Sequence, residues 1–137
     1  MVNSCYTAGP MSGYEHFNFA LFDEASDFLR SLGWTVYNPA DHDREIGINP
    51  DEPLPEWWSL SHAMRWDLAR VAETDAIVFL PGWEQSIGSN KEARVGLDTG
   101  SEFFLYDNSN GVKSLIPLET SYVAKVVASN CTCREFM

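Results

Sequence analysis

Basic residues are scarce in this sequence. Its 137 residues include 9 Lys and Arg against 20 Asp and Glu, which gives a formal net charge of −11. Long nucleic acids are bound through clustered Lys and Arg, so we expect no nucleic-acid polymer as a partner. A mononucleotide remains compatible with this charge, because a few backbone N–H groups at a helix start can hold one phosphate.

Long hydrophobic runs are also missing. No apolar stretch approaches the ~18 residues that a membrane span needs, so we expect no membrane association. The first residues, MVNSCYTAGP, lack the basic segment and apolar segment of a signal peptide, which predicts a cytoplasmic protein. The length, together with 45% hydrophobic residues, predicts a single globular domain over residues 1–137.

Cysteine is rare, with Cys5, Cys131 and Cys133 as its three occurrences. An odd count without paired spacing indicates reduced thiols rather than a disulfide framework. The pair Cys131-x-Cys133 has no second pair to complete a metal site, so we interpret it as free thiols. We expect neither a metal nor a cofactor.

The spacing of apolar residues predicts strands that alternate with helices. Expected strands cover 2–8, 34–37, 76–80, 103–106 and 112–116, and expected helices cover 17–32, 60–71, a segment from about 89 to 99, and 119–129. Residues 39–56 contain four prolines and many acids, and we expect a long surface loop there. The alternation predicts a mainly parallel sheet with helices on both faces.

Ligands of such sheets bind outside the carboxyl ends of the strands. This rule selects three places: residues 9–13, the loop after Asn38, and residues 81–92. Within that loop, Asp41, His42 and Asp43 resemble metal ligands in composition. Neighbouring residues on a flexible loop rarely converge on one ion, so we interpret them as solvated charge.

Glu92 is the first candidate for chemistry. The spacing Ser89-x-x-Glu92 matches a capping box, in which both side chains satisfy the first backbone donors of a helix. A carboxylate in the first helical turn is also held ionised by the helix dipole, and a carboxylate nucleophile must be ionised. The small residues Ser86, Gly88 and Ser89 would let a substrate approach the backbone beside Glu92.

Asp67 is the second candidate. It flanks the apolar stripe of its predicted helix, and a half-buried carboxylate needs a partner or a function. An ion pair with Arg65 or Arg70, or a bond to a neighbouring loop, is the structural alternative.

The segment YTAGPMSG places a glycine-containing turn directly after a strand, where phosphates or sugars are often held. Tyr6, Gly9, Pro10, Ser12 and Gly13 are therefore candidate site residues, although Tyr6 is equally compatible with the core.

Trp83 precedes the Glu92 segment. It has two interpretations of equal weight, as a ring that lines a nucleobase pocket or as a packing residue.

Residues 6–41, from YTAGP to YNPAD, and residues 64–93, from MRWDLA to SNKEA, resemble the nucleoside deoxyribosyltransferase-like superfamily in content and order. The resemblance extends over roughly residues 4–106 and is strongest to short, often phage-borne members. The superfamily includes nucleoside 2-deoxyribosyltransferases and deoxynucleoside 5-monophosphate N-glycosidases. It implies a flavodoxin-like (Rossmann-like) three-layer α/β fold with a five-stranded, mainly parallel sheet.

The resemblance also implies roles for individual residues. Glu92 matches the nucleophilic glutamate, and Tyr6 matches a tyrosine that orients it. Asp67 matches a helix aspartate that contacts the sugar or assists the leaving base. Ser86 matches a serine that helps to hold a substrate phosphate, and Gly9-Pro10 the turn along the substrate.

The sequence departs from the family patterns in two places. Transferases carry an Asp-x-Gly-Thr-x-x-Glu motif, and its aspartate is absent from residues 85–92, which argues against a transferase. An arginine found in the first loop of the hydrolases is absent from residues 11–14, which argues against strong 5-phosphate recognition.

We therefore expect an N-glycosidase that cleaves the base–deoxyribose bond of a deoxynucleoside or its 5-monophosphate. Base exchange by a nucleoside 2-deoxyribosyltransferase, and nucleotide binding without turnover, are the alternatives. The expected partners are a small-molecule nucleoside or nucleotide and further copies of the chain in a homodimer or larger homo-oligomer. If the gene is phage-borne, the location would be the host cytoplasm.

Overall fold

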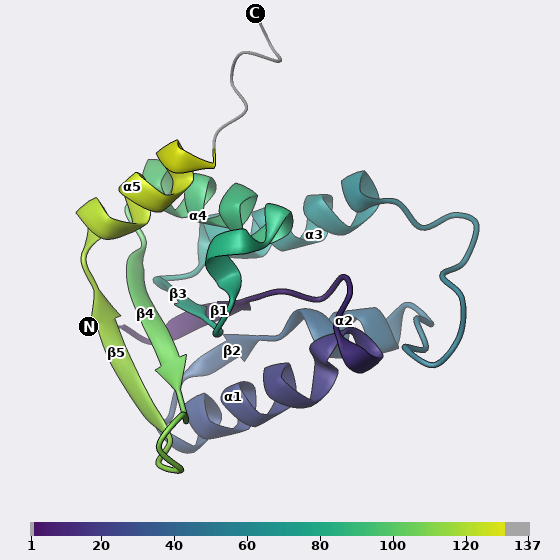
Figure 1. The fold of residues 1–137 in the computed structure, drawn as a ribbon, viewed down its shortest axis with the longest axis horizontal. Helices are drawn as coiled ribbons and strands as arrows, with labels where there is room; N and C mark the ends of the chain where they lie inside the picture. The colour runs from purple at the N-terminus through teal and green to yellow at the C-terminus, as the bar shows by residue number, and fades with distance from the viewer. Residues whose placement is uncertain (1, 131–137) are drawn as a thin grey trace, which may run out of the picture.

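One five-stranded sheet, with the strand order β2-β1-β3-β4-β5, forms the middle layer of the protein (Figure 1). The computed structural model describes residues 2–130, and Cys131 and Cys133 lie outside this range. The strands are β1 (Ser4–Ala8), β2 (Thr35–Tyr37), β3 (Ala76–Phe79), β4 (Glu102–Asp107) and β5 (Ser114–Leu118). The first four run parallel, and β5 pairs with β4 in the antiparallel direction.

Helices cover both faces of this sheet (Figure 1). Helices α1 (Phe19–Ser31) and α2 (Pro39–Glu45) pack on one face, and α3 (Leu60–Glu73), α4 (Ile87–Thr99) and α5 (Thr120–Ser129) pack on the other. Two short 3-10 helices, η1 (Glu15–Asn18) and η2 (Trp83–Gln85), complete the elements. The predicted flavodoxin-like three-layer α/β fold is therefore confirmed.

The core consists of two apolar layers, one on each face of the sheet. The layer under α1 and α2 contains Phe22 and Leu29, and the layer under α3, α4 and α5 contains Val71 and Ala93. All four residues of β3 are buried, as expected of a central parallel strand covered on both faces.

Helix α4 lies unusually close to the sheet at Gly96. A Cβ atom at this position would lie 2.7 Å from Cδ1 of Ile77 and 3.1 Å from Cε1 of Phe103. Glu92 lies one turn before Gly96, on the same side of the helix. The close approach at Gly96 therefore directs Glu92 toward the sheet.

Several expected elements differ from the structure. Residues 39–45 form α2 instead of a loop, because Asn38 Oδ1 accepts a hydrogen bond from the N–H of Ala40 at 3.0 Å and Pro39 occupies the first helical turn. Helix α1 begins at Phe19 instead of residue 17, since residues 16–18 have positive φ angles. The last strand lies two residues later than expected.

The topology determines where a ligand can bind. The chain leaves β1 toward β2 on one side, and β3 lies on the other side of β1, so the switch point of the sheet lies between β1 and β3. In folds of this class the crevice beyond the carboxyl ends of these two strands is the usual ligand site.

We expect Gly96→Ala to lower the free energy of unfolding by about 1–3 kcal/mol, because the new methyl group would overlap two core side chains. Gly88→Ala is the matched control on the same helix, since its Cβ would meet only Cε of Met64, at 3.5 Å. This control should stay within about 1 kcal/mol of wild type. Urea unfolding of the three proteins measures the difference, and equal midpoints would contradict the close packing inferred at Gly96.

Candidate active site

A cavity of about 340 Å³ opens at the switch point of the sheet. Its lining comes from all three places that the sequence predicted: the turn after β1, the segment after β2, and the segment between β3 and the second turn of α4. Helix α3 supplies the remaining wall. The volume falls within the roughly 300–1,000 Å³ typical of small-molecule sites.

Glu92 lies at the inner end of this cavity and is only 4% exposed. The hydroxyl group of Tyr6, on β1, donates a hydrogen bond to Oε2 of Glu92. The same hydroxyl group interacts with the carboxyl group of Asp67 on α3. Three residues from three different elements, far apart in the sequence, therefore meet at one point.

The predicted capping box at the start of α4 is wrong. Ser86 is the N-cap of this helix, and its Oγ accepts a hydrogen bond from the N–H of Ser89 at 3.2 Å. The helix consequently begins at Ile87, and its N-cap lies three residues before the expected one. Glu92 thus belongs to the second turn, beyond the helix end where the dipole acts most strongly.

The electrostatics of Glu92 also differ from the expectation. Burial, and secondly the charge of Asp67, raise the pKa of Glu92 well above its usual range, although the hydrogen bond from Tyr6 opposes this shift. Burial, with the nearby charges of Glu92 and Asp67, also raises the pKa of Tyr6 well above its usual value. Tyr6 is therefore a hydrogen-bond donor here and not a base.

Asp67 is half-buried and faces the cavity. Burial, and secondly the charge of Asp43, raise its pKa to about 7, against the effect of the bond with Tyr6. The alternative ion pair with Arg70 is not formed, because Arg70 Nε lies 2.6 Å from Oε1 of Glu73. Asp67 and Glu92 are close enough for their protons to titrate as a pair.

Two buried hydroxyl groups near these carboxyl groups have no partner within residues 2–130. They are Oγ1 of Thr7 and Oγ of Ser89, on residues that are 0% and 1% exposed. Both residues line the cavity. Buried polar atoms without partners are uncommon in folded proteins, and here both belong to residues of the cavity wall.

Asp43 is a cavity residue that the sequence interpretation missed. The sequence predicted a solvated charge, but Asp43 lies on α2 and lines the cavity. Burial raises the pKa of Asp43 to about 6, and the charge of Arg44 opposes this shift. The dipeptide Asn38-Pro39, a cap followed by a proline, was the available signal for a helix here. On a helix, Asp43 lies one turn after Pro39 and therefore on the same side, and both residues line the cavity.

Most of the other predicted site residues also line the cavity. They are Gly9, Pro10, Ser12, Ser86, Gly88 and Ser89. Gly13 is next to this lining but not part of it. Trp83 is buried in the core and stacks on Phe79 with ring centroids 3.9 Å apart, so the packing interpretation of Trp83 is the correct one.

Within residues 2–130, no group of three or more His, Cys, Asp or Glu side chains is arranged to hold a metal ion. None of the helices in this part of the chain has the length and apolarity to cross a bilayer.

Comparison with protein families matches residues 3–104 to the family described as Domain of unknown function (DUF4406). This range covers most of the 137 residues, and the chain belongs to that family. It includes β1, α3 and the whole of α4, and hence Tyr6, Asp67 and Glu92. A search of curated proteins finds no match.

We expect Glu92→Gln to stabilise the protein at pH 8. Carboxyl groups whose pKa is raised on folding favour the fold while protonated, and this stability is lost as the pH rises from the ordinary carboxyl pKa of about 4 through the raised pKa. The amide has no charge to bury and can still accept the bond from Tyr6. The Tm of Glu92→Gln should therefore exceed that of wild type by a few degrees at pH 8, on the order of 1–2 kcal/mol, with a smaller gain at pH 4.5.

Asp98→Asn, an exposed change on the same helix, is the control and should leave Tm unchanged at both pH values. A lower Tm for Glu92→Gln than for wild type at pH 8 would contradict a destabilising buried charge.

Proposed function

We propose that this member of the DUF4406 family is an N-glycosidase that cleaves the base–deoxyribose bond of a deoxynucleoside or its 5-monophosphate. The observation that carries the proposal is the contact of Tyr6 with both Glu92 and Asp67 inside one small-molecule cavity. The resemblance of residues 6–41 and 64–93 to the nucleoside deoxyribosyltransferase-like superfamily supports the same chemistry.

The proposed reaction assigns different roles to the two carboxyl groups. The C1–N bond breaks with its electron pair moving to the base, and positive charge develops at C1 of the sugar. Ionised Glu92, held by Tyr6, attacks C1 and forms a glycosyl-enzyme ester, while protonated Asp67 gives its proton to the departing base. Water then attacks C1 and gives one proton to the ionised Asp67, which restores the protonated acid. The ester bond breaks with its electron pair moving to the carboxylate of Glu92, and deoxyribose or its 5-phosphate is released.

The raised pKa of Asp67 supports its role as the acid, whereas the ionised form of Glu92 depends on the bond from Tyr6. Two neighbouring carboxyl groups of which one holds a proton would provide one acid and one base at the same time. The bond from Tyr6 favours the ionised form of Glu92. Because Tyr6 donates its hydrogen bond to Glu92, the proposal places the remaining proton on Asp67, next to the leaving base.

A 5-phosphate would lie at the start of α4, where Ser86, Gly88 and Ser89 line the cavity and the first backbone N–H groups favour an anion. No Lys, Arg or His is among the described residues that line the cavity, so phosphate binding would depend on these neutral donors. Nucleosides and monophosphates both belong in the test for this reason.

The homodimer or larger homo-oligomer expected from the resemblance remains a prediction. Leu60 and Ile87 line the cavity and are 43% and 70% exposed. Trp57, in the segment before α3, is also exposed. A second copy of the chain covering this apolar rim would close the site.

We expect wild-type protein to release free base from at least one of the common or 5-modified deoxynucleosides or their 5-monophosphates. Glu92→Ala should lose at least about 10³-fold in kcat/KM, because it removes the nucleophile. Chromatography of the reaction mixture measures the free base. A second base added to the mixture distinguishes hydrolysis from base exchange, since only exchange gives a new nucleoside.

Circular dichroism of Glu92→Ala controls for folding. Equal base release by wild type and a folded Glu92→Ala would exclude the nucleophile. If no substrate loses its base, catalysis on these compounds is excluded, and nucleotide binding without turnover takes its place.

The activity should fall as the pH rises through about 7, because Asp67 must be protonated to act as the acid. Tyr6, Glu92 and Asp43 are the neighbours of Asp67, so the pH at which the activity falls depends on all four residues together. Asp67→Asn should abolish the fall of activity above about pH 7, which is the alkaline limb of the pH profile. It should also lower kcat by about 10²–10⁴-fold for substrates with poor leaving groups. An unchanged alkaline limb in Asp67→Asn would assign the acid to another group.

A further inference from the structure

We propose that Asp43 selects the base: its carboxylate accepts a hydrogen bond from an exocyclic amino group, so the site favours amino-bearing bases over their keto counterparts. The inference rests on the proposed function for the identity of the ligand. The evidence for Asp43 itself comes from its position in the cavity, from the partners of its neighbours and from the lining around it.

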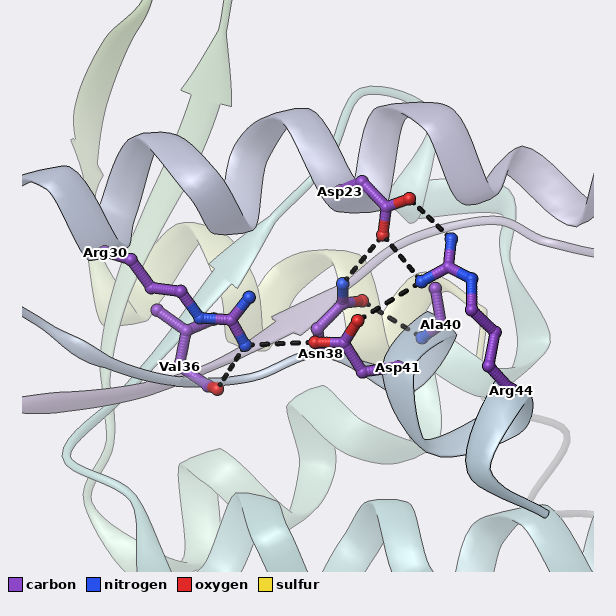
Figure 2. Close-up of polar contacts among 7 residues, drawn as sticks. All are labelled: Asp23, Arg30, Val36, Asn38, Ala40, Asp41 and Arg44. Atoms are coloured by element: carbon purple, nitrogen blue, oxygen red, sulfur yellow. Dashed lines mark hydrogen bonds and ion pairs between the residues drawn. The ribbon is translucent and has the colours of Figure 1, made fainter.

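A network of charged side chains fixes the helix that carries Asp43 (Figure 2). Arg44 donates to Oδ1 of Asp23 at 3.1 Å and to Oδ1 of Asp41 at 3.2 Å, and Arg30 donates to Oδ2 of Asp41 at 3.1 Å. Asn38 donates to Oδ1 of the same Asp23 at 3.1 Å. These bonds attach α2 to α1 and to the end of β2.

This network does not include Asp43. The hydrogen bonds of its neighbour Arg44 go to Asp23 and Asp41, as Figure 2 shows. Within residues 2–130, the carboxyl group of Asp43 itself takes part in no hydrogen bond or ion pair, although burial raises its pKa to about 6. A half-buried carboxylate without a partner on a cavity wall is available to a ligand.

The three carboxyl groups lie in a defined order along the cavity. Glu92 is affected by the charge of Asp67, and Asp67 is affected by the charge of Asp43. Asp43 follows β2 and Glu92 follows β3, which lie on opposite sides of β1. Asp67 interacts with Tyr6 on β1. We therefore place Asp67 between the other two carboxyl groups. If C1 of the sugar contacts Glu92 and the base contacts Asp67, the far edge of the base extends toward Asp43.

The lining of the cavity that Asp43 shares suits a flat aromatic ring. Pro39 and Trp58 line the cavity as well, whereas no cationic side chain is among its described lining residues. A carboxylate accepts a hydrogen bond from the amino group of cytosine or adenine and repels the carbonyl oxygen that replaces it in uracil or hypoxanthine. An unpaired acceptor therefore discriminates between bases that differ at this one group.

The test compares deoxycytidine with deoxyuridine, and deoxyadenosine with deoxyinosine, as nucleosides and as 5-monophosphates at pH 7.5. We expect wild type to prefer the amino member of each pair by at least about tenfold in kcat/KM. Asp43→Asn should reduce this preference by about tenfold, because the amide can also donate to a carbonyl oxygen. Asp43→Ala should also reduce the preference, but it should not improve kcat/KM for the keto member of each pair, because alanine cannot donate a hydrogen bond.

Asp41→Asn is the matched control, because Asp41 lies on the same helix but bonds with Arg30 and Arg44 instead of lining the cavity. It should change stability and leave the base preference intact. Base release with a preference that Asp43→Asn and Asp43→Ala leave unchanged would overturn the assignment of Asp43 and keep the glycosidase.

Binding of free cytosine and free uracil, measured by calorimetry, separates the two proposals. If no substrate is cleaved but cytosine binds more tightly than uracil in wild type alone, the proposed activity fails while the role of Asp43 stands. Equal binding of the two bases, or no binding of either in a protein that also cleaves nothing, would overturn the role of Asp43.

Discussion

The buried carboxyl group of Glu92 is the constraint on which the arrangement of the site depends. A carboxyl group removed from water must find a hydrogen-bond donor or keep its proton. Tyr6 on β1 provides the donor. The pKa of Glu92 is nevertheless raised, because this one hydrogen bond does not offset the loss of hydration on burial. Asp67 next to this pair adds a second acid, whose ionisation is opposed by burial and by the charge of Asp43 and favoured by the bond with Tyr6. A site selected for stability alone would not place these groups together.

The fold delivers this arrangement through backbone packing. Gly96 brings α4 within contact of Ile77 and Phe103, and Glu92 one turn earlier then reaches Tyr6 on β1. The switch point of the sheet leaves the space beyond β1 and β3 open, so the buried pair borders on a cavity and not on the core. The same packing that stabilises the α4 layer therefore exposes one side of the carboxyl pair to a ligand.

The sequence predicted the sheet and the meeting place of the site residues, because both follow from periodicity and topology. Buried AIVF in β3 and the glycine-containing turn after β1 are local signals with a direct structural meaning. The local electrostatics could not be predicted in the same way. Both Ser86 and Ser89 have hydroxyl groups able to cap a helix, and only tertiary packing places the start of α4 at Ile87. That difference of three residues moves Glu92 from the helix end into the interior.

The role of Asp43 shows a further limit of sequence interpretation, since the acids in residues 41–43 look alike there. In the structure Asp41 bonds with Arg30 and Arg44, while Asp43 lines the cavity. A cavity with three carboxyl groups and no cation among its described lining residues disfavours anions at its centre and favours donor groups and positive charge. In the proposed reaction, C1 of the sugar supplies the positive charge and an amino group on the base supplies the donor. The proposed reaction thus uses the acidity of the cavity. The raised pKa values of the carboxyl groups that line it reflect how unfavourable their ionisation is in the folded protein.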